Sequence, residues 1–181
     1  MNSNEKIDYL FKILLRFDHY INVANTKALG LATVLVTLYI ALISFFGTSV
    51  LSNIKVLNEM SFAYCISFSV LVFISFSAFF SFNSALKVIF PDLRNIKNIE
   101  TYKSNIFFGD ISSRELKDFK NEISNLSYDI YIDDLENQVY TLSCIVKDKF
   151  KNMNKAMENL LYYFIPLSVV FIIQYVIFVR G

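Results

Sequence analysis

The sequence predicts an all-α integral membrane protein with three transmembrane helices, an N-terminal amphipathic helix and a helical cytosolic segment between the second and third crossings. Three stretches that contain no charged residue predict this fold: 28–54, 60–86 and 159–179. Each can span a bilayer, because an apolar helix needs about 20 residues to cross the hydrocarbon core. A charge at the centre of such a helix costs roughly 2.5 to 3.5 kcal/mol, so uncharged stretches of this length favour membrane crossings.

The remaining residues are too few for two separate soluble domains, so we expect a single membrane domain with a cytosolic part over residues 1–181. Its expected parts follow the uncharged stretches. They are a cytosolic helix at 1–27, crossings at 28–50, 60–86 and 157–179, and a cytosolic helical region at 87–156.

The distribution of basic residues predicts the orientation of these crossings. Residues 1–27 hold four lysines and arginines and residues 83–156 hold eleven, whereas the other flanks hold only Lys55 and Arg180. Because cytoplasmic loops of membrane proteins are enriched in Lys and Arg, the N-terminus and the middle segment are expected in the cytoplasm. The C-terminus is then expected in the periplasm.

An apolar stripe at alternating steps of three and four residues predicts the N-terminal amphipathic helix. Its members are Ile7, Leu10, Leu14, Phe17, Ile21 and Ala24. Neither glycine nor proline occurs before Gly30, so this helix is expected to continue directly into the first crossing.

Small residues share one face of each of the first two crossings, and such faces let a second helix approach closely. In the first crossing they are Gly30, Thr33, Thr37, Ala41, Ser44 and Thr48. In the second they are Ser67, Ser77, Ser81 and Ser84, and phenylalanines fill the other side. Helix packing and the lining of a pore both remain open as roles for these hydroxyl groups.

The middle segment carries two further helical patterns. Ser112 and Glu115 form a capping-box pattern, which predicts a short amphipathic helix at 113–126. From Leu135 an apolar seam runs without a break to Phe164, which predicts one helix over 129–179 that enters the third crossing. Pro166 is expected to kink this helix within the membrane.

This long helix has an acidic start and a basic stretch beside the membrane. The basic residues are Lys147, Lys149, Lys151 and Lys155. Attraction to lipid headgroups explains them, and so does contact with a phosphate ligand or a neighbouring subunit, so both interpretations stay open.

Motifs for catalysis are absent from the sequence. There is no glycine-rich phosphate loop, no His or Cys spacing for a metal and no Ser-His-Asp set, so we expect neither an enzyme nor a cofactor nor a metal site. Cys65 falls inside the second crossing and Cys144 in the cytosolic region, so no disulfide is expected.

Three blocks carry a resemblance to a known family. They are Val23 to Ala28, Asn105 to Ile111, and Gln138 to Tyr140 with Leu142-Ser143 and Lys149-Phe150. In block order and crossing pattern, from about Leu15 to the C-terminus, the chain resembles the transmembrane effector family of Pycsar antiphage systems. Asn25 stands where an aspartate is expected in that family.

The resemblance implies a multi-pass protein of the bacterial inner membrane whose functional partner is a pyrimidine nucleotide cyclase. The implied ligand is cyclic UMP or cyclic CMP, and the implied outcome is damage to the membrane that causes abortive infection. Nucleic acid polymers are not among the expected partners. Because three crossings can hardly enclose an aqueous path alone, we also expect a homo-oligomer.

A cyclic mononucleotide brings one negative charge and a planar base, so its site should offer a cation, an amide and an aromatic face. The candidate nucleotide-binding residues are Lys27, Arg94, Phe108, Asp110, Gln138 and Lys149, with Phe107 as an alternative to Phe108. Each also has a structural interpretation: the lysines can mark the membrane interface, Gln138 can bridge helices, and Asp110 can follow a simple turn.

Two other classes of protein fit the same sequence features. One is a membrane-anchored helical interaction module that recruits a cytosolic partner without gating anything itself. The other is a constitutive channel or small transporter, which is disfavoured because no charged residue lies inside a crossing and no inverted repeat is evident.

Overall fold

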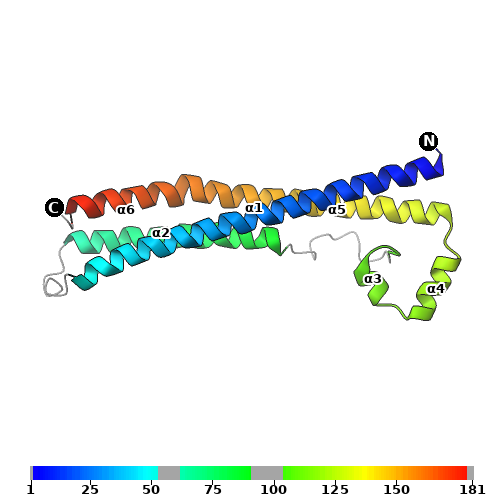
Figure 1. Cartoon of the computed structure of the whole chain (residues 1–181), viewed down its shortest axis with the longest axis horizontal. Coiled ribbons are helices and arrows are strands. Elements are labelled where there is room, and N and C mark those ends of the chain that lie inside the picture. The colour runs from blue at the N-terminus through cyan, green and yellow to red at the C-terminus, as the bar shows by residue number, and fades with distance from the viewer. Residues whose placement is uncertain (1, 53–61, 91–103, 179–181) are drawn as a thin grey trace. The chain divides into compact units, whose positions relative to one another are not determined.

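The protein is described by a computed structural model that covers residues 2–52, 62–90 and 104–178, and these residues are helical almost throughout (Figure 1). The elements are α1 (Ser3–Ser52), α2 (Phe62–Ile89), α3 (Phe108–Ser112), α4 (Leu116–Ser124), α5 (Tyr128–Asn159), the π-helical segment η3 (Leu160–Phe164) and α6 (Ile165–Phe178). No strand occurs within the described ranges. The predicted all-α fold class is confirmed.

Three helical segments are long and apolar enough to cross a membrane: Ser3–Thr48, Cys65–Ile89 and Tyr128–Ile177. Each of them contains most of one uncharged stretch, so the predicted number of three membrane-spanning helices is confirmed. The expected continuity of the N-terminal helix with the first crossing is also confirmed, because α1 has no break between Ser3 and Ser52.

Contacts divide the chain into two compact units. The charged unit comprises residues 1–23 and 91–149, and the membrane unit comprises residues 24–90 and 150–181. Helices α1 and α5 each contribute residues to both units.

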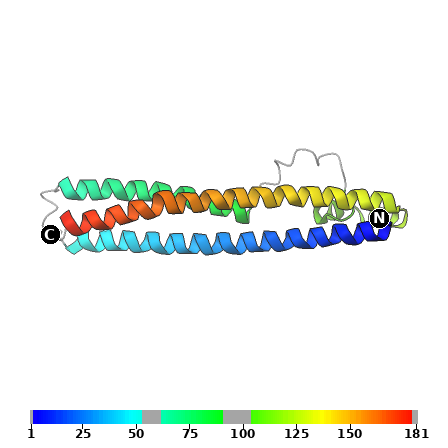
Figure 2. The same ribbon diagram turned by 90° about the horizontal axis from the view of Figure 1, so that it is seen from above.

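In the membrane unit, α1, α2 and α6 lie side by side as a three-helix bundle (Figures 1 and 2). Its main core is apolar and consists of Leu35, Leu42, Ile74, Ala78, Leu160, Phe164 and Phe171. A layer of buried alanines, Ala32, Ala85 and Ala156, lets α1, α2 and the end of α5 approach closely at another level of the bundle.

The serine face of α2 points into this bundle, which corresponds to the helix-packing alternative considered for it. Ser67 and Ser81 are fully buried, and the Ser81 hydroxyl donates a hydrogen bond of 2.8 Å to the carbonyl oxygen of Ala156. Ser77 makes a longer contact of 3.5 Å with the carbonyl oxygen of Asn159. The phenylalanines of the opposite side are exposed: Phe68, Phe73, Phe76, Phe79 and Phe80. The hydroxyl groups therefore fasten α2 to the helical turns that lead into η3.

Within the described ranges, the small-residue face of the first crossing is not covered by other helices of the chain. All six of its members are exposed: Gly30, Thr33, Thr37, Ala41, Ser44 and Thr48. The bundle is instead packed through Ala32, Leu35 and Leu42 on another side of α1. The hydroxyl of Thr37 bonds to the carbonyl oxygen of Thr33 in its own helix, at 2.9 Å.

One irregularity interrupts the helix that runs from Tyr128 to Phe178. The π-helical segment η3 ends two residues before Pro166, and the N–H of Ile165 donates to the carbonyl oxygen of Leu160. Proline has no N–H, and its ring clashes with the carbonyl group four residues earlier in an α-helix. Widening the preceding turn relieves that clash, so the disturbance expected at Pro166 takes the form of a π turn.

In the charged unit, the start of α1 packs along the start of α5. Leu10, Ile132 and Leu135 form the buried centre of this contact. On its exposed side, Lys6 pairs with Glu136 at 2.8 Å. The predicted amphipathic stripe of the N-terminal helix therefore meets the beginning of the apolar seam of α5.

The prediction of a helix at 113–126 is wrong about the residue at which the helix starts and about the residue that caps it. The chain forms two short helices here, α3 and α4, which are separated at residues 113–115. The hydroxyl of Ser112 donates to the carbonyl oxygen of Gly109 at 3.0 Å, so it closes α3 instead of capping α4. Glu115 occupies the N-cap position of α4 without a side-chain capping bond.

Candidate functional site

A turn in the charged unit is anchored on a buried carboxylate. Asp134 of α5 has no exposed surface, and its two oxygens accept hydrogen bonds of 2.7 Å from the Ser104 hydroxyl and from the Asn105 N–H. A carboxylate without solvent is costly unless donors of this kind surround it. We call residues 104–114 the anchored turn, because these bonds fix its first residues to α5.

Ser104 organises the backbone of the anchored turn. Its hydroxyl oxygen accepts hydrogen bonds of 3.0 Å from the N–H groups of Ile106 and Phe107. Its own N–H donates to the Asp110 carboxylate at 2.8 Å. Side-chain acceptors thus pair three backbone N–H groups of a segment that lies outside regular structure.

Arg114 closes the anchored turn from its far end. Its guanidinium donates to the carbonyl oxygen of Ser104 at 3.0 Å, to the side-chain oxygen of Asn105 and to the carboxylate of Glu122. The side chain is only 5% exposed. The rigid planar fork of an arginine suits such a role, because it bonds several acceptors at once.

The anchored turn presents an aromatic pair. The rings of Phe107 and Phe108 have centroids 4.8 Å apart, and Phe108 is 76% exposed. Gly109 permits this arrangement, since a Cβ atom there would lie 2.6 Å from the Phe107 ring. The network therefore positions a largely uncovered phenyl ring on the surface of the charged unit.

Among the described residues, the hydrogen-bond network of the anchored turn carries more negative than positive groups. It contains the carboxylates of Asp110, Glu122 and Asp134 and the guanidinium of Arg114. An anionic phosphate is repelled by such a set, whereas a neutral planar base can stack on Phe108. The turn can thus hold the base of a nucleotide better than its phosphate.

The structure brings only part of the predicted site together. Phe108 and Asp110 share the anchored turn, but the carboxylate of Asp110 is already bonded to the turn's backbone. Gln138 and Lys149 lie on α5 in the same unit, and Lys27 is exposed on the part of α1 that belongs to the membrane unit. Arg94 lies outside the described residues.

Lys149 is a buried cation of α5 in the charged unit. Lys149 is 3% exposed, and desolvation by burial lowers the pKa of its ammonium group below the ordinary value of 10.5. It shares one side of α5 with Gln138, since eleven residues make about three turns and a rise of roughly 16 Å. A nearby anion would favour the charged form of this lysine and so oppose the effect of burial.

Sequence reasoning missed Ser104, Arg114 and Asp134. One signal was available, because Asp134 directly precedes Leu135 and so lies beside the start of the apolar seam. An acidic residue at the border of a buried face implies a donor opposite it. The donors themselves, Ser104 and Asn105, are about 30 residues away in sequence, and no spacing rule connects them.

Fold and turn together define a helical membrane protein with three crossings and a charged unit that presents an aromatic turn. The sequence profile of the Pycsar effector protein domain matches residues 9–178, which include most of both units. The chain belongs to the Pycsar effector protein domain family. The resemblance found in the sequence is thereby confirmed.

One known protein is similar to this chain over nearly its whole length. The Pycsar effector protein EcPycTM of Escherichia coli is 29% identical over 181 residues, which span 99% of this chain and 96% of that protein. No solved structure matches. Family membership makes this chain a membrane effector of antiphage defence, and the family implies a cyclic nucleotide signal from a cyclase partner. Its members are effectors and not known enzymes.

Proposed function

We propose that cyclic UMP or cyclic CMP, made by a partner pyrimidine nucleotide cyclase, activates this effector, which then impairs the bacterial inner membrane and causes abortive infection. The observation that carries this proposal is the family match over residues 9–178, because it joins the charged unit and the membrane unit in one effector domain. The N-terminus then lies in the cytoplasm and the C-terminus in the periplasm.

In this proposal the charged unit binds the nucleotide. Phe108 supplies the aromatic face for the pyrimidine, since its ring is exposed and held by the anchored turn. Lys149 attracts the phosphate, and the amide of Gln138 pairs with the base edge. Lys27, in the membrane unit, and Arg94, outside the described residues, remain the other candidate cations. Asp110 contributes by holding the turn, because its carboxylate is bonded to Ser104.

Binding is transmitted through the helices that contribute to both units. Every residue between Tyr128 and Phe178 is helical, so a change in α5 propagates to η3 without crossing a loop. At η3 the bonds from Ser81 and Ser77 hold the helix against α2. We propose that activation rearranges this attachment and the contacts between subunits of a homo-oligomer, for which the exposed small residues Gly30, Thr33 and Thr37 of α1 offer a surface.

Calorimetric titration of the detergent-solubilised full chain tests the ligand. We expect heat of binding with cyclic UMP or cyclic CMP and none with cyclic AMP. Phe108→Ala should weaken binding by about tenfold or more, because stacking on an aromatic side chain contributes roughly 1 to 3 kcal/mol. Leu116→Ala is the matched control, since it also removes an exposed apolar side chain from the charged unit. Equal effects of the two variants would contradict the assignment of Phe108.

Membrane potential separates this function from the anchored interaction module. In cells that express the chain, a rise in cyclic UMP or cyclic CMP should collapse the potential reported by a voltage-sensitive dye. A module that only recruits a partner would bind the nucleotide and leave the potential intact. That outcome would overturn the proposed membrane damage while leaving ligand binding in place.

A further inference from the structure

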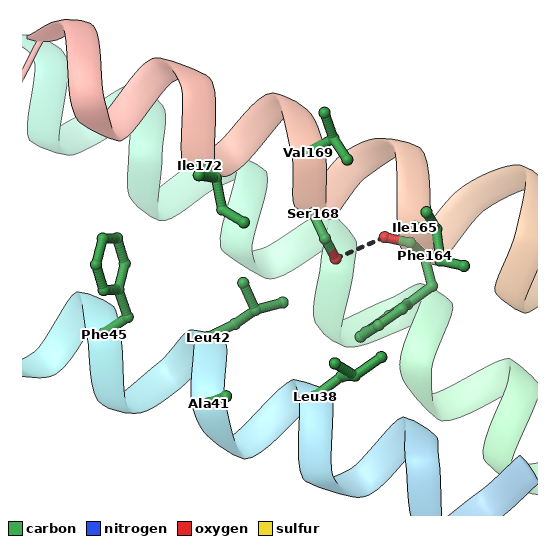
Figure 3. Close-up of a pocket in the computed structure, with 9 residues that line it drawn as sticks. All are labelled: Leu38, Ala41, Leu42, Phe45, Phe164, Ile165, Ser168, Val169 and Ile172. Atoms are coloured by element: carbon green, nitrogen blue, oxygen red, sulfur yellow. Dashed lines mark hydrogen bonds between the residues drawn. The ribbon is translucent and has the colours of Figure 1, made fainter.

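A groove in the membrane unit separates α1 from η3 and α6. It has a volume of about 440 Å³, and Figure 3 shows side chains of both walls pointing toward one another across it. The wall on α1 consists of Leu38, Ala41, Leu42 and Phe45. The opposite wall consists of Phe164, Ile165, Ser168, Val169 and Ile172.

The lining of this groove is hydrocarbon except at one position. Ser168 carries the single side-chain hydroxyl, which donates a 2.7 Å hydrogen bond to the carbonyl oxygen of Phe164 in its own helix (Figure 3). That oxygen is part of the helix backbone. The groove therefore suits an apolar occupant that makes no hydrogen bonds.

The groove is continuous with the lipid-facing surface of the crossings. All of its residues fall within the uncharged stretches 28–54 and 159–179. Its rim is exposed, with Leu38 at 43% and Val169 at 49%, whereas its floor is covered, with Leu42 at 8% and Phe164 at 1%. Bilayer hydrocarbon thus meets the rim directly, and no polar barrier lies between it and the floor.

A contact between α1 and α6 limits the size of the occupant. The rings of Phe45 and Tyr175 meet edge to face with centroids 4.5 Å apart, and those of Phe46 and Phe171 lie 6.0 Å apart. A helix is about 10 to 12 Å wide with its side chains, so it cannot lie between α1 and α6 where these rings meet. A single flexible hydrocarbon chain can enter beside them.

We propose that this groove binds one acyl chain of a membrane phospholipid. The chain would cover the apolar floor formed by Leu42 and Phe164 and would lie against the last residue of η3. Bound lipid would thereby contact the one irregular turn of the long helix and stabilise its present packing. The inference concerns the membrane unit alone and does not depend on the proposed nucleotide.

Photolabelling in vesicles tests the proposal. The full chain is reconstituted in vesicles of phosphatidylethanolamine and phosphatidylglycerol that contain a trace of phosphatidylcholine with a diazirine on one acyl chain, and labelled residues are mapped by mass spectrometry. We expect stronger labelling at Leu42 and Phe164 than at Phe76 of α2. Phe76 is 59% exposed, so lipid that only surrounds the protein would label it far more than the covered floor residues.

Variants that fill the groove sharpen the comparison. Ala41→Phe should reduce labelling of Phe164 by about fivefold or more, because a phenyl ring takes the space of the chain. Ser168→Leu should do the same from the opposite wall. Ile40→Phe is the matched control and should leave the label unchanged, since residue 40 is exposed and points about 150° away from the mean direction of the four groove residues of α1.

Two outcomes would overturn the proposal. Labelling of Phe76 equal to or above that of Phe164 in the unmodified protein would show surrounding lipid only. Disulfide-linked dimers formed by Ala41→Cys, together with no label at Phe164, would show that a second copy covers the groove. The first comparison needs no variant, so it holds even if a groove-filling variant fails to fold.

Discussion

The hydroxyl of Ser104 donates to the carboxylate of Asp134 at 2.7 Å, and both side chains are buried although 30 residues separate them in sequence. This bond joins the turn before α3 to the first turns of α5. Because the same serine oxygen also accepts from two backbone N–H groups, one residue determines both where the turn is attached and how it is shaped.

Removing the anchor should destabilise the charged unit. Asp134→Ala leaves the Ser104 hydroxyl and the Asn105 N–H without their acceptor in a buried place, which costs roughly 3 kcal/mol. We expect a lower melting temperature of the detergent-solubilised protein, measured by circular dichroism. Asp133→Ala is the control, because its carboxylate is exposed and should change stability by no more than about 0.5 kcal/mol. Similar losses from both variants would contradict the anchoring role.

Gly109→Ala should disturb the aromatic pair. The added Cβ would lie 2.6 Å from the Phe107 ring, so that ring or the turn must move, at a cost of about 1 to 3 kcal/mol. We expect a lower melting temperature and weaker binding of cyclic UMP or cyclic CMP in the titration. Gly47→Ala places a methyl group where no atom lies within 4 Å, so it should leave both measurements unchanged or slightly raise stability.

Ser81→Ala should loosen α2 from the segment before η3. The variant removes a 2.8 Å bond to the Ala156 carbonyl oxygen, and hydrogen bonds between membrane helices contribute about 0.6 to 1.7 kcal/mol. Ser69→Ala is the control, because that exposed hydroxyl bonds only to Cys65 in its own helix. Melting in detergent should separate the two variants, and a loss for Ser69→Ala as large as that for Ser81→Ala would argue against a specific attachment.

Lys149 should make stability depend on pH in the alkaline range. Burial lowers its pKa in the folded protein below 10.5, so the unfolded chain binds more protons between the two values. The contribution of Lys149 to the free energy of unfolding should therefore rise with pH between its folded and its unfolded pKa. That contribution should be lowest below the folded pKa. Melting curves between neutral pH and about pH 10.5 measure the slope.

The corresponding variants identify the source of that slope. Lys149→Met should flatten it, because the titrating group is gone. Lys151→Met should retain it, since residue 151 is exposed and lies on the same helix. An unchanged slope in Lys149→Met would mean that another group titrates.

Most of the fold could be predicted from the sequence because the bilayer imposes a length on each crossing. The uncharged stretches predicted the three membrane-spanning helices. The absence of glycine and proline before Gly30 predicted that α1 continues without a break into the first crossing. The break between α3 and α4 could not be foreseen, because Ser112 and Glu115 satisfy a local capping pattern. There, Arg114 bonds back to Ser104 and Asn105, and the chain leaves the helix.

The candidate site could be predicted only where its residues lie close together in the sequence. Asp110 and Phe108 belong to one short block, and the structure places both in the anchored turn. Asp134 belongs to the acidic start of the long helix, and helical spacing does not report what lies opposite its side chain. Its bonds to Ser104 and Asn105 depend on tertiary folding, which brings the two segments together.

The π turn at η3 amounts to one surplus residue in an otherwise α-helical path from Tyr128 to Phe178. Deleting Tyr162, which is 72% exposed, would restore regular α-helical hydrogen bonding through this segment. The helix faces before and after η3 would stay aligned. Alone, that deletion would press the Pro166 ring against a carbonyl group, so only its combination with Pro166→Ala should be tolerated. The surplus residue is therefore the feature that accommodates the proline within this helix.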